Sequence, residues 1–169
     1  MFVKSRKKLD LIGSTEYVEI AGIKNIPAKI DTGADSSAVW ASNIDISKDG
    51  TLTFCLFDKS YKHYTGQKLA RAKSSYRVKI VRSSNGDEEI RYRTELPLKL
   101  GKRSIRAMFT LADRSKNNFP VLIGRKTLKG KFLVDVSKAS VAKISNPQTP
   151  RLNRELEADP YSFHQRYVK

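Results

Sequence analysis

Apolar and polar residues alternate along most of this chain with a period of two, which is typical of half-buried β-strands. The alternation predicts strands at residues 17–23, 26–30, 51–57, 76–81, 89–100, 104–112, 119–124 and 131–137. Turn-forming residues separate these segments. The strongest turn signal is Asn85-Gly86, because both residues tolerate the positive φ of a two-residue hairpin turn. Many short strands at this spacing predict an all-β fold, either a small barrel or a sandwich.

Helical character is confined to Lys126–Leu128 and to a tail at about residues 150–165. The chain has 169 residues, enough for one domain with a real hydrophobic core. We therefore expect residues 1–144 to form a β domain. Residues 145–169 are expected to form a C-terminal extension that carries a short helix and packs on the surface.

The composition is strongly basic, with 33 Lys and Arg against 17 Asp and Glu and a net charge of +16. Such a charge attracts polyanions, including nucleic acid and acidic peptides, in a salt-sensitive way. The basic residues are spread along the sequence, and no recognition helix, zinc finger or aromatic-rich RNA-binding signature accompanies them. The charge is therefore a guide to the substrate or partner, and it is the only feature that would support nucleic acid or the ribosome as a partner.

No apolar run approaches the roughly 18 residues of a membrane span, and the first residues lack the apolar segment of a secretory signal. We expect a cytoplasmic protein without membrane association. The single cysteine, Cys55, reads as a strand thiol and forbids an internal disulfide or a cysteine-based metal cluster.

The segment IPAKIDTGADSSAVW, residues 26–40, contains the first candidate chemistry, because an apolar strand ends there on Asp31. A lone carboxylate in that position costs desolvation energy. Two such carboxylates facing each other share one proton, so that one activates water while the other polarises a carbonyl. Gly33 would allow close backbone approach, and the Thr32 hydroxyl could anchor the loop. Alone, Asp-Thr-Gly leaves open a simple surface turn.

A second segment, FPVLIGRKTL at residues 119–128, changes this interpretation. Together, KIDTGADSSAV and PVLIGRKTL closely resemble the two sequence hallmarks of retropepsin-like aspartic proteases. The intervening segment YRVKIVRSSNGDEEIRYRT resembles the flap hairpin of that family. Its tip would consist of Ser83, Ser84, Asn85 and Gly86. From about residue 12 to residue 139 the chain is similar to a bacterial group of retropepsin-like proteins often labelled "ATP-dependent zinc protease".

This resemblance implies a small closed all-β barrel with one short helix, and it implies roles for particular residues. Asp31 would be catalytic, and Asp35 and Arg125 would form a buried supporting ion pair. The active-site loop would also contain Thr32, Gly33 and Ala34, and the strand–helix junction would contain Ile123 and Gly124. Because there is a single Asp-Thr-Gly, the catalytic pair would be Asp31 from each of two chains in a homodimer with two-fold symmetry.

The label of the bacterial group implies that ATP and zinc are bound, but the residues of this chain favour neither an ATP site nor a zinc site. There is no G-x-x-x-x-G-K-[ST] sequence, since Gly101-Lys102 is followed by arginine. There is no H-E-x-x-H, and the two histidines, His63 and His164, are expected at the surface. We therefore expect no cofactor and no metal, and metal-dependent hydrolysis is the least supported mechanism.

The leading hypothesis is a homodimeric aspartic endopeptidase that cleaves an extended peptide or protein substrate, with acidic peptides favoured by the charge. Some members of the resembled group are associated with enzymes that add glutamates to ribosomal proteins, which suggests trimming of acidic tails. The alternative is a catalytically inactive retropepsin-fold module that binds acidic peptides, the ribosome or RNA. Two features depart from viral retropepsins: a polar flap tip, and a segment at residues 46–75 without a counterpart.

Overall fold

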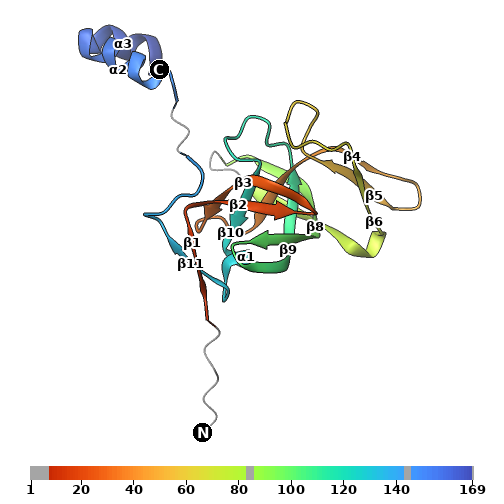
Figure 1. Cartoon of the computed structure of the whole chain (residues 1–169). Helices are drawn as coiled ribbons and strands as arrows, with labels where there is room; N and C mark the ends of the chain where they lie inside the picture. Colours follow the sequence, from red (N-terminus) through yellow and green to blue (C-terminus); the bar gives the residue numbers. More distant parts are fainter. Residues whose placement is uncertain (1–7, 83–85, 143–145, 169) are drawn as a thin grey trace.

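The computed structural model describes residues 8–82, 86–142 and 146–168 (Figure 1). Eleven strands and three α-helices are assigned within these ranges, together with one 3-10 turn at Lys73–Ser75. The strands are β1 (Asp10–Gly13), β2 (Thr15–Ile20), β3 (Ile23–Asp31), β4 (Ser37–Ile46), β5 (Leu52–Leu56), β6 (Lys68–Arg71), β7 (Tyr76–Arg82), β8 (Glu88–Leu100), β9 (Arg103–Ala112), β10 (Val121–Gly124) and β11 (Phe132–Asp135). The helices are α1 (Arg125–Leu128), α2 (Thr149–Ala158) and α3 (Pro160–Tyr167).

Six strands form a closed barrel in the order β10-β3-β2-β8-β9-β4, and β4 closes the circle by pairing with β10. The side chains that alternate toward the interior form one hydrophobic core. Among its fully buried members are Ile20, Ile26, Leu98, Phe109 and Ile123. The predicted closed all-β barrel is thereby confirmed.

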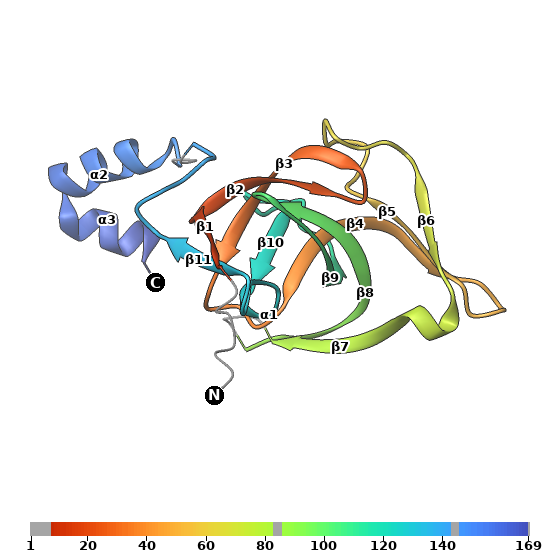
Figure 2. The same ribbon diagram turned by 60° about the horizontal axis from the view of Figure 1, so that its bottom comes forward.

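Further strands extend this barrel on three sides (Figure 2). β7 pairs along the first half of β8 and forms a long hairpin with it. β5 and β6 continue the sheet outward from β4, so that residues 46–75 are largely an added pair of strands and their connections. β1 and β11 form a separate two-stranded parallel sheet.

The alternation located most strands but missed three of them, β1, β4 and β6. The first five residues of β4 are all buried, so this strand shows no alternation of apolar and polar positions. The segment 17–23, predicted as one strand, contains a turn at Ala21 and Gly22, both of which have positive φ.

The tail contains two helices, α2 and α3, where the sequence predicted one short helix. The helices pack on each other, and the Tyr167 hydroxyl donates a 2.8 Å hydrogen bond to Glu155. Neither helix has a buried residue, and both lie apart from the barrel in the two views (Figures 1 and 2). The division of the chain at residue 144 stays a prediction. Within the described ranges, no helix has the length and apolarity needed to cross a membrane.

Candidate functional site

Asp31 is the last residue of β3, and the parallel pairing of β3 with β10 places it beside Gly124. The two sequence hallmarks therefore meet at one end of the barrel, although 92 residues separate them in the sequence. Ile123 pairs with Ile30 one step earlier in the same ladder and is fully buried. The core thus fixes the strand ends on which the candidate site is built.

The Asp31 carboxylate is held by its own loop. Its Oδ1 accepts hydrogen bonds from the backbone N–H groups of Gly33 (3.1 Å) and Ala34 (3.2 Å). Its Oδ2 lies 3.7 Å from Lys29 Nζ, and 27% of the side chain is exposed. One carboxylate oxygen is thus oriented by the loop, while the group keeps access to solvent. Thr32 is exposed beside it and makes no hydrogen bond through its hydroxyl within the described residues.

Gly124, and not Gly33, is the glycine that permits close backbone packing within this chain. A Cβ on Gly124 would lie 2.5 Å from the Ser36 carbonyl carbon and 2.9 Å from the Ala34 carbonyl oxygen. A Cβ on Gly33 would meet only Asp31 Oδ1, at 3.4 Å. The close backbone approach expected at Gly33 is therefore not found among the described residues of the chain.

The loop after Asp31 is fastened to α1 by backbone hydrogen bonds and by a buried hydroxyl. Arg125 N–H donates to the Ala34 carbonyl (2.8 Å), and Gly124 N–H donates to Ser37 Oγ (3.1 Å). Ser37 Oγ also lies 2.7 Å from the Thr127 hydroxyl. Buried polar groups satisfied in this way resist movement, because breaking one bond leaves another group unpaired. The sequence does not single out Thr127, although both Thr127 and Ser37 lie within the hallmark segments.

The Asp35 carboxylate contacts three cations, and the predicted partner, Arg125, is the most distant of them. Arg125 Nη2 is 3.7 Å from Asp35 Oδ1, whereas Asp35 Oδ2 accepts from Lys126 (2.8 Å) and Lys79 (3.0 Å). The hydrogen bonds from Lys126 and Lys79 hold the pKa of Asp35 well below its usual value. The predicted Asp35–Arg125 contact is present, but the side chains are exposed and the pair is not buried.

Lys79 connects this cluster to the β7–β8 hairpin, since its ammonium group contacts both Asp35 and Ser36 Oγ. In the hairpin register Lys79 lies opposite Arg91, and Ile80 lies opposite Ile90. Successive residues of a strand point to opposite faces, so the Lys79–Arg91 pair faces the Asp31 loop and the isoleucine pair faces away. Ile80 and Ile90 are accordingly 60% and 71% exposed. The alternation in YRVKIV signals these two faces, but not which one turns inward.

Three of the predicted flap residues, Ser83, Ser84 and Asn85, lie outside the described residues. Gly86 follows them with a φ of +90°, a conformation that glycine adopts more readily than other residues.

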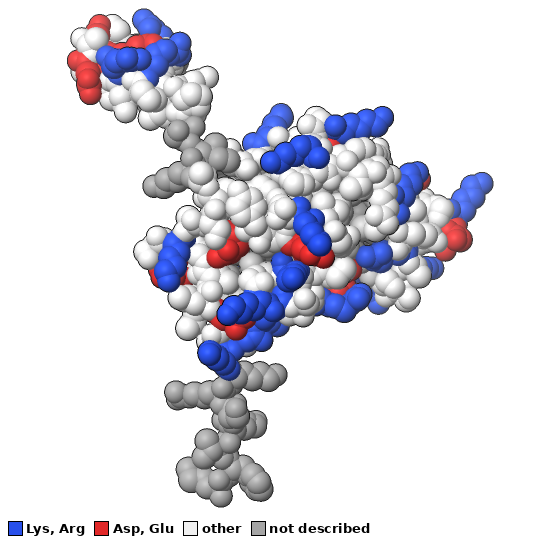
Figure 3. Space-filling view, in the orientation of Figure 1, with Lys and Arg blue, Asp and Glu red and all other residues white. Residues whose placement is uncertain are grey.

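A cleft of about 380 Å³ lies between the hairpin and the loop that follows Asp31. Its charged lining consists of Lys79, Arg82, Arg91, Arg114 and a single acid, Asp35. Burial and the neighbouring Arg91 lower the pKa of Arg114, while Asp31 acts in the opposite direction. Basic side chains are also spread over the visible face of the barrel (Figure 3). The charged lining of this cleft is therefore mainly basic.

The donor atoms needed for a structural or catalytic zinc are not gathered at this site. Across the described parts of the chain, no three His, Cys, Asp or Glu side chains lie close enough together to hold a metal ion. His63 was expected at the surface, but it is half-buried against Tyr61, and burial lowers its pKa. Cys55 is buried in β5, as expected for a strand thiol. The zinc of the "ATP-dependent zinc protease" label therefore does not fit the described residues.

Comparison with known proteins gives a consistent family assignment. Residues 11–145 match the family described as RimB-like, "Retropepsin-like aspartic endopeptidase RimB". A probable alpha-L-glutamate ligase of Desulfotalea psychrophila is 29% identical over 155 residues, which are 83% of this chain and 33% of that protein. A probable alpha-L-glutamate ligase of Shewanella pealeana is 29% identical over 132 residues, 76% of this chain and 29% of that protein. The chain therefore spans about a third of the length of these relatives.

Among solved structures, a Legionella pneumophila protein of unknown function has the same fold, with a TM-score of 0.59 and 24% identity. The match covers 80% of this chain and 100% of the Legionella chain.

Proposed function

Because the chain belongs to the RimB-like family of retropepsin-like aspartic endopeptidases, we propose that it hydrolyses peptide bonds with a water molecule activated by two Asp31 carboxylates. Each carboxylate would come from one chain of a homodimer. The ionised Asp31 accepts a proton from the water as its oxygen bonds to the peptide carbonyl carbon, and the protonated Asp31 donates to the carbonyl oxygen. The tetrahedral intermediate collapses when the Asp31 that took the proton from water donates it to the amide nitrogen and the C–N bond breaks, while the other Asp31 takes back its proton from the former carbonyl oxygen.

The position of Asp31 is the observation that carries this proposal. The carboxylate ends a core strand, is oriented by two loop N–H groups and is partly exposed, next to a cleft that the β7–β8 hairpin covers. A catalytic group must be held in place and yet reach its substrate, and Asp31 meets both requirements. A single chain supplies one such carboxylate, so the mechanism needs a second copy.

The preferred substrate in this proposal is an acidic peptide, in particular a run of glutamates. Four cations and one carboxylate line the cleft, and the chain as a whole carries a net charge of +16. Two of these cations already have partners outside the lining of the cleft, since Arg82 pairs with Glu88 and Arg91 pairs with Glu89, so Lys79 and Arg114 carry most of this argument. The curated relatives are named as probable alpha-L-glutamate ligases, and about a third of each resembles this chain. A peptidase domain beside a glutamate-adding activity would remove or trim what the ligase adds. The single buried thiol suits a reducing compartment, and we place this activity in the cytoplasm.

The test is hydrolysis of peptides that carry a glutamate tail, measured by mass spectrometry for the full chain and for Asp31→Asn. The isosteric amide cannot serve as the base, so we expect activity to fall by about 10³-fold or more. Its Oδ1 still accepts from Gly33 and Ala34, so the melting temperature should hardly change. A matched Asp45→Asn variant, altered at an exposed position on β4, should keep full activity.

Sedimentation of the same samples tests the dimer independently. A chain that cleaves the peptides as a strict monomer would refute the shared pair of carboxylates. Binding of glutamate peptides that is unchanged in Asp31→Asn, without cleavage by either protein, would instead favour the inactive binding module. Replacement of the glutamates by glutamines should weaken cleavage, and a lack of effect would reject the acidic preference alone.

A further inference from the structure

The cleft between the β7–β8 hairpin and the Asp31 loop contains one cation without a carboxylate partner, Arg114. Of the four cations that line this cleft, the other three are paired: Lys79 with Asp35, Arg82 with Glu88 and Arg91 with Glu89. Arg114 is half-buried and forms no ion pair in the described parts of the chain. Such a charge costs free energy, because it has lost water without gaining an opposite charge.

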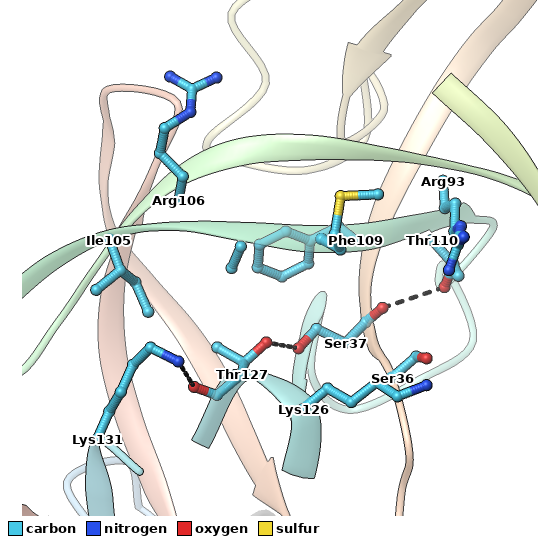
Figure 4. Close-up of a pocket in the computed structure, with 12 residues that line it drawn as sticks. Ser36, Ser37, Arg93, Ile105, Arg106, Phe109, Thr110, Lys126, Thr127 and Lys131 are labelled. Carbon is cyan, nitrogen blue, oxygen red and sulfur yellow. Dashed lines mark hydrogen bonds between the residues drawn. The ribbon is translucent and has the colours of Figure 1, made fainter. Parts of the chain in front are cut away.

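Arg114 lies in the connection between β9 and β10, and hydrogen bonds hold it there. Its Nε donates to the Phe119 carbonyl (3.0 Å), and its own carbonyl accepts from the Asn117 N–H (2.9 Å). The strand before it, β9, is tied to β4, since the Thr110 hydroxyl donates to the Ser37 carbonyl at 3.2 Å (Figure 4). The protein therefore orients the guanidinium before a substrate binds.

The end of the Arg114 guanidinium is left for a ligand. With Nε bonded to Phe119, the two terminal nitrogens have no hydrogen-bond acceptor among the described residues. These nitrogens present a pair of N–H groups, and a carboxylate accepts such a pair through its two oxygens. Burial and the neighbouring Arg91 lower the pKa of Arg114, and Asp31 raises it. The side chain thus lies within electrostatic range of both the hairpin and the proposed catalytic carboxylate.

On the basis of the proposed peptidase function, we propose that Arg114 binds a carboxylate of the peptide substrate and sets the acidic preference of the cleft. The substrate would supply the single negative charge that Arg114 lacks. Gly33 and Ala34, which follow Asp31, line the same cleft, so the bound carboxylate would belong to a residue near the scissile bond. Lys79 contributes less, because its ammonium group is already engaged by the Asp31 loop.

The test combines substitutions in the protein with substitutions in glutamate-tailed peptides, as a double-mutant cycle. Calorimetry measures binding in the Asp31→Asn background, where the peptide stays intact, and one glutamate at a time is replaced by glutamine. At one position this replacement should weaken binding by about tenfold or more, the loss expected for a hydrogen bond between charged groups. With Arg114→Met, the same replacement should change the affinity less than about threefold. Arg114→Lys should keep part of the preference, because lysine keeps the charge but not the fork of donors.

Arg154→Met is the matched control, since it removes the same charge from an exposed position on α2. It should alter the difference between glutamate and glutamine peptides by less than about twofold. An equal loss of preference in Arg154→Met would overturn the proposal, because net charge and not Arg114 would then select the peptide. An unchanged preference in Arg114→Met would overturn it as well. If Arg114→Met fails to fold, Arg114→Lys decides, and a preference as strong as that of the native arginine would reject the role.

Two further measurements locate the carboxylate and separate this role from the peptidase activity. Amidation of the peptide C-terminus should have no effect if a glutamate side chain is the ligand, and should reproduce the Arg114-dependent loss if the terminal carboxylate is.

Cleavage of the same peptides is then followed by mass spectrometry. Arg114-dependent binding without cleavage by wild type would reject the peptidase and keep Arg114 as a binding residue. Cleavage that falls equally for glutamate and glutamine peptides in Arg114→Met would keep the peptidase and reject the role in specificity. Absence of binding to every peptide would overturn the proposal.

Discussion

The two sides of the cleft between the β7–β8 hairpin and the Asp31 loop are built in opposite ways. On one side, the Asp31 loop and the β10–α1 junction are packed so closely that a single added carbon at Gly124 would approach Ser36 to 2.5 Å. On the other side, the β7–β8 hairpin leaves Val78, Ile80 and Ile90 exposed. The hydrogen bonds between the two sides come from one side chain, Lys79, among the residues that the structure describes.

This difference matches the demands of the proposed chemistry. A catalytic carboxylate needs a fixed position, and close packing around buried hydrogen bonds supplies it. A covering hairpin must open and close over a substrate, and few buried contacts keep the cost of opening low. The comparison predicts that equivalent substitutions will lower the free energy of unfolding strongly at the β10–α1 junction and only slightly in the β7–β8 hairpin.

The largest effect is expected for Gly124→Ala. The new Cβ would meet backbone atoms of Ser36 and Ala34, which cannot move aside without shifting the loop. We expect a loss of about 3 kcal/mol or more in the free energy of unfolding, measured by urea denaturation. Gly33→Ala, in the same loop, should cost less than about 0.5 kcal/mol, because its Cβ meets only Asp31 Oδ1 at 3.4 Å. Similar losses in both variants would contradict the proposed role of Gly124.

Ser37→Ala should have the next largest effect. It removes the acceptor of the Gly124 N–H and the partner of the Thr127 hydroxyl in a buried site. Leaving buried donors unpaired should cost about 2 kcal/mol in the same unfolding measurement. Ser104→Ala, at an exposed position on β9, should cost less than about 0.5 kcal/mol. A near-zero effect of Ser37→Ala would mean that water replaces the hydroxyl and that the junction is looser than its geometry indicates.

The junction could be predicted from the sequence better than the hairpin, for a physical reason. Gly124 ends an apolar strand, and Asp31 ends a strand whose buried residues Ile26, Ala28 and Ile30 are all apolar. Strand pattern and hallmark therefore agree on the position of both residues. The inner face of the hairpin could not be predicted in this way, because alternation defines two faces without saying which one is buried. Here the cationic face with Lys79 turns inward, contrary to the usual preference for burying apolar residues.

The partners of Asp35 show the same limit. Arg125 could be paired with it by the family resemblance, but Lys79 and Lys126 come closer to the carboxylate. Long flexible side chains choose their partners by local geometry, which the order of residues along the chain does not specify.

Gly86→Ala tests the hairpin side of the comparison. The φ of +90° disfavours alanine, but nothing lies within 4 Å of the new Cβ. Only backbone strain remains, and a loss of about 1 kcal/mol in the free energy of unfolding is expected. Gly86→Ala should reduce peptidase activity more than stability, because the backbone strain lies in the part of the β7–β8 hairpin that must move. A stability loss as large as that of Gly124→Ala would contradict the comparison.

The smallest effect is expected where the two sides meet, at Asp35, and it should depend on pH. Lys126 and Lys79 lower the pKa of Asp35 in the folded protein, whereas in the unfolded chain it returns to about 3.9. The resulting stabilisation is fully present above the unfolded pKa. It shrinks as the pH falls below about 4, because the unfolded chain then binds a proton that the folded protein does not. The stability gap between wild type and Asp35→Asn should therefore be widest near pH 7 and narrow toward pH 3, when urea midpoints are measured across this range.

Asp45→Asn, at an exposed position on β4, serves as the control and should show almost no gap in stability from wild type at either pH. A gap for Asp35→Asn that stayed constant down to pH 3 would show that the cations do not act on this carboxylate, and that the hairpin is held to the loop by something other than charge.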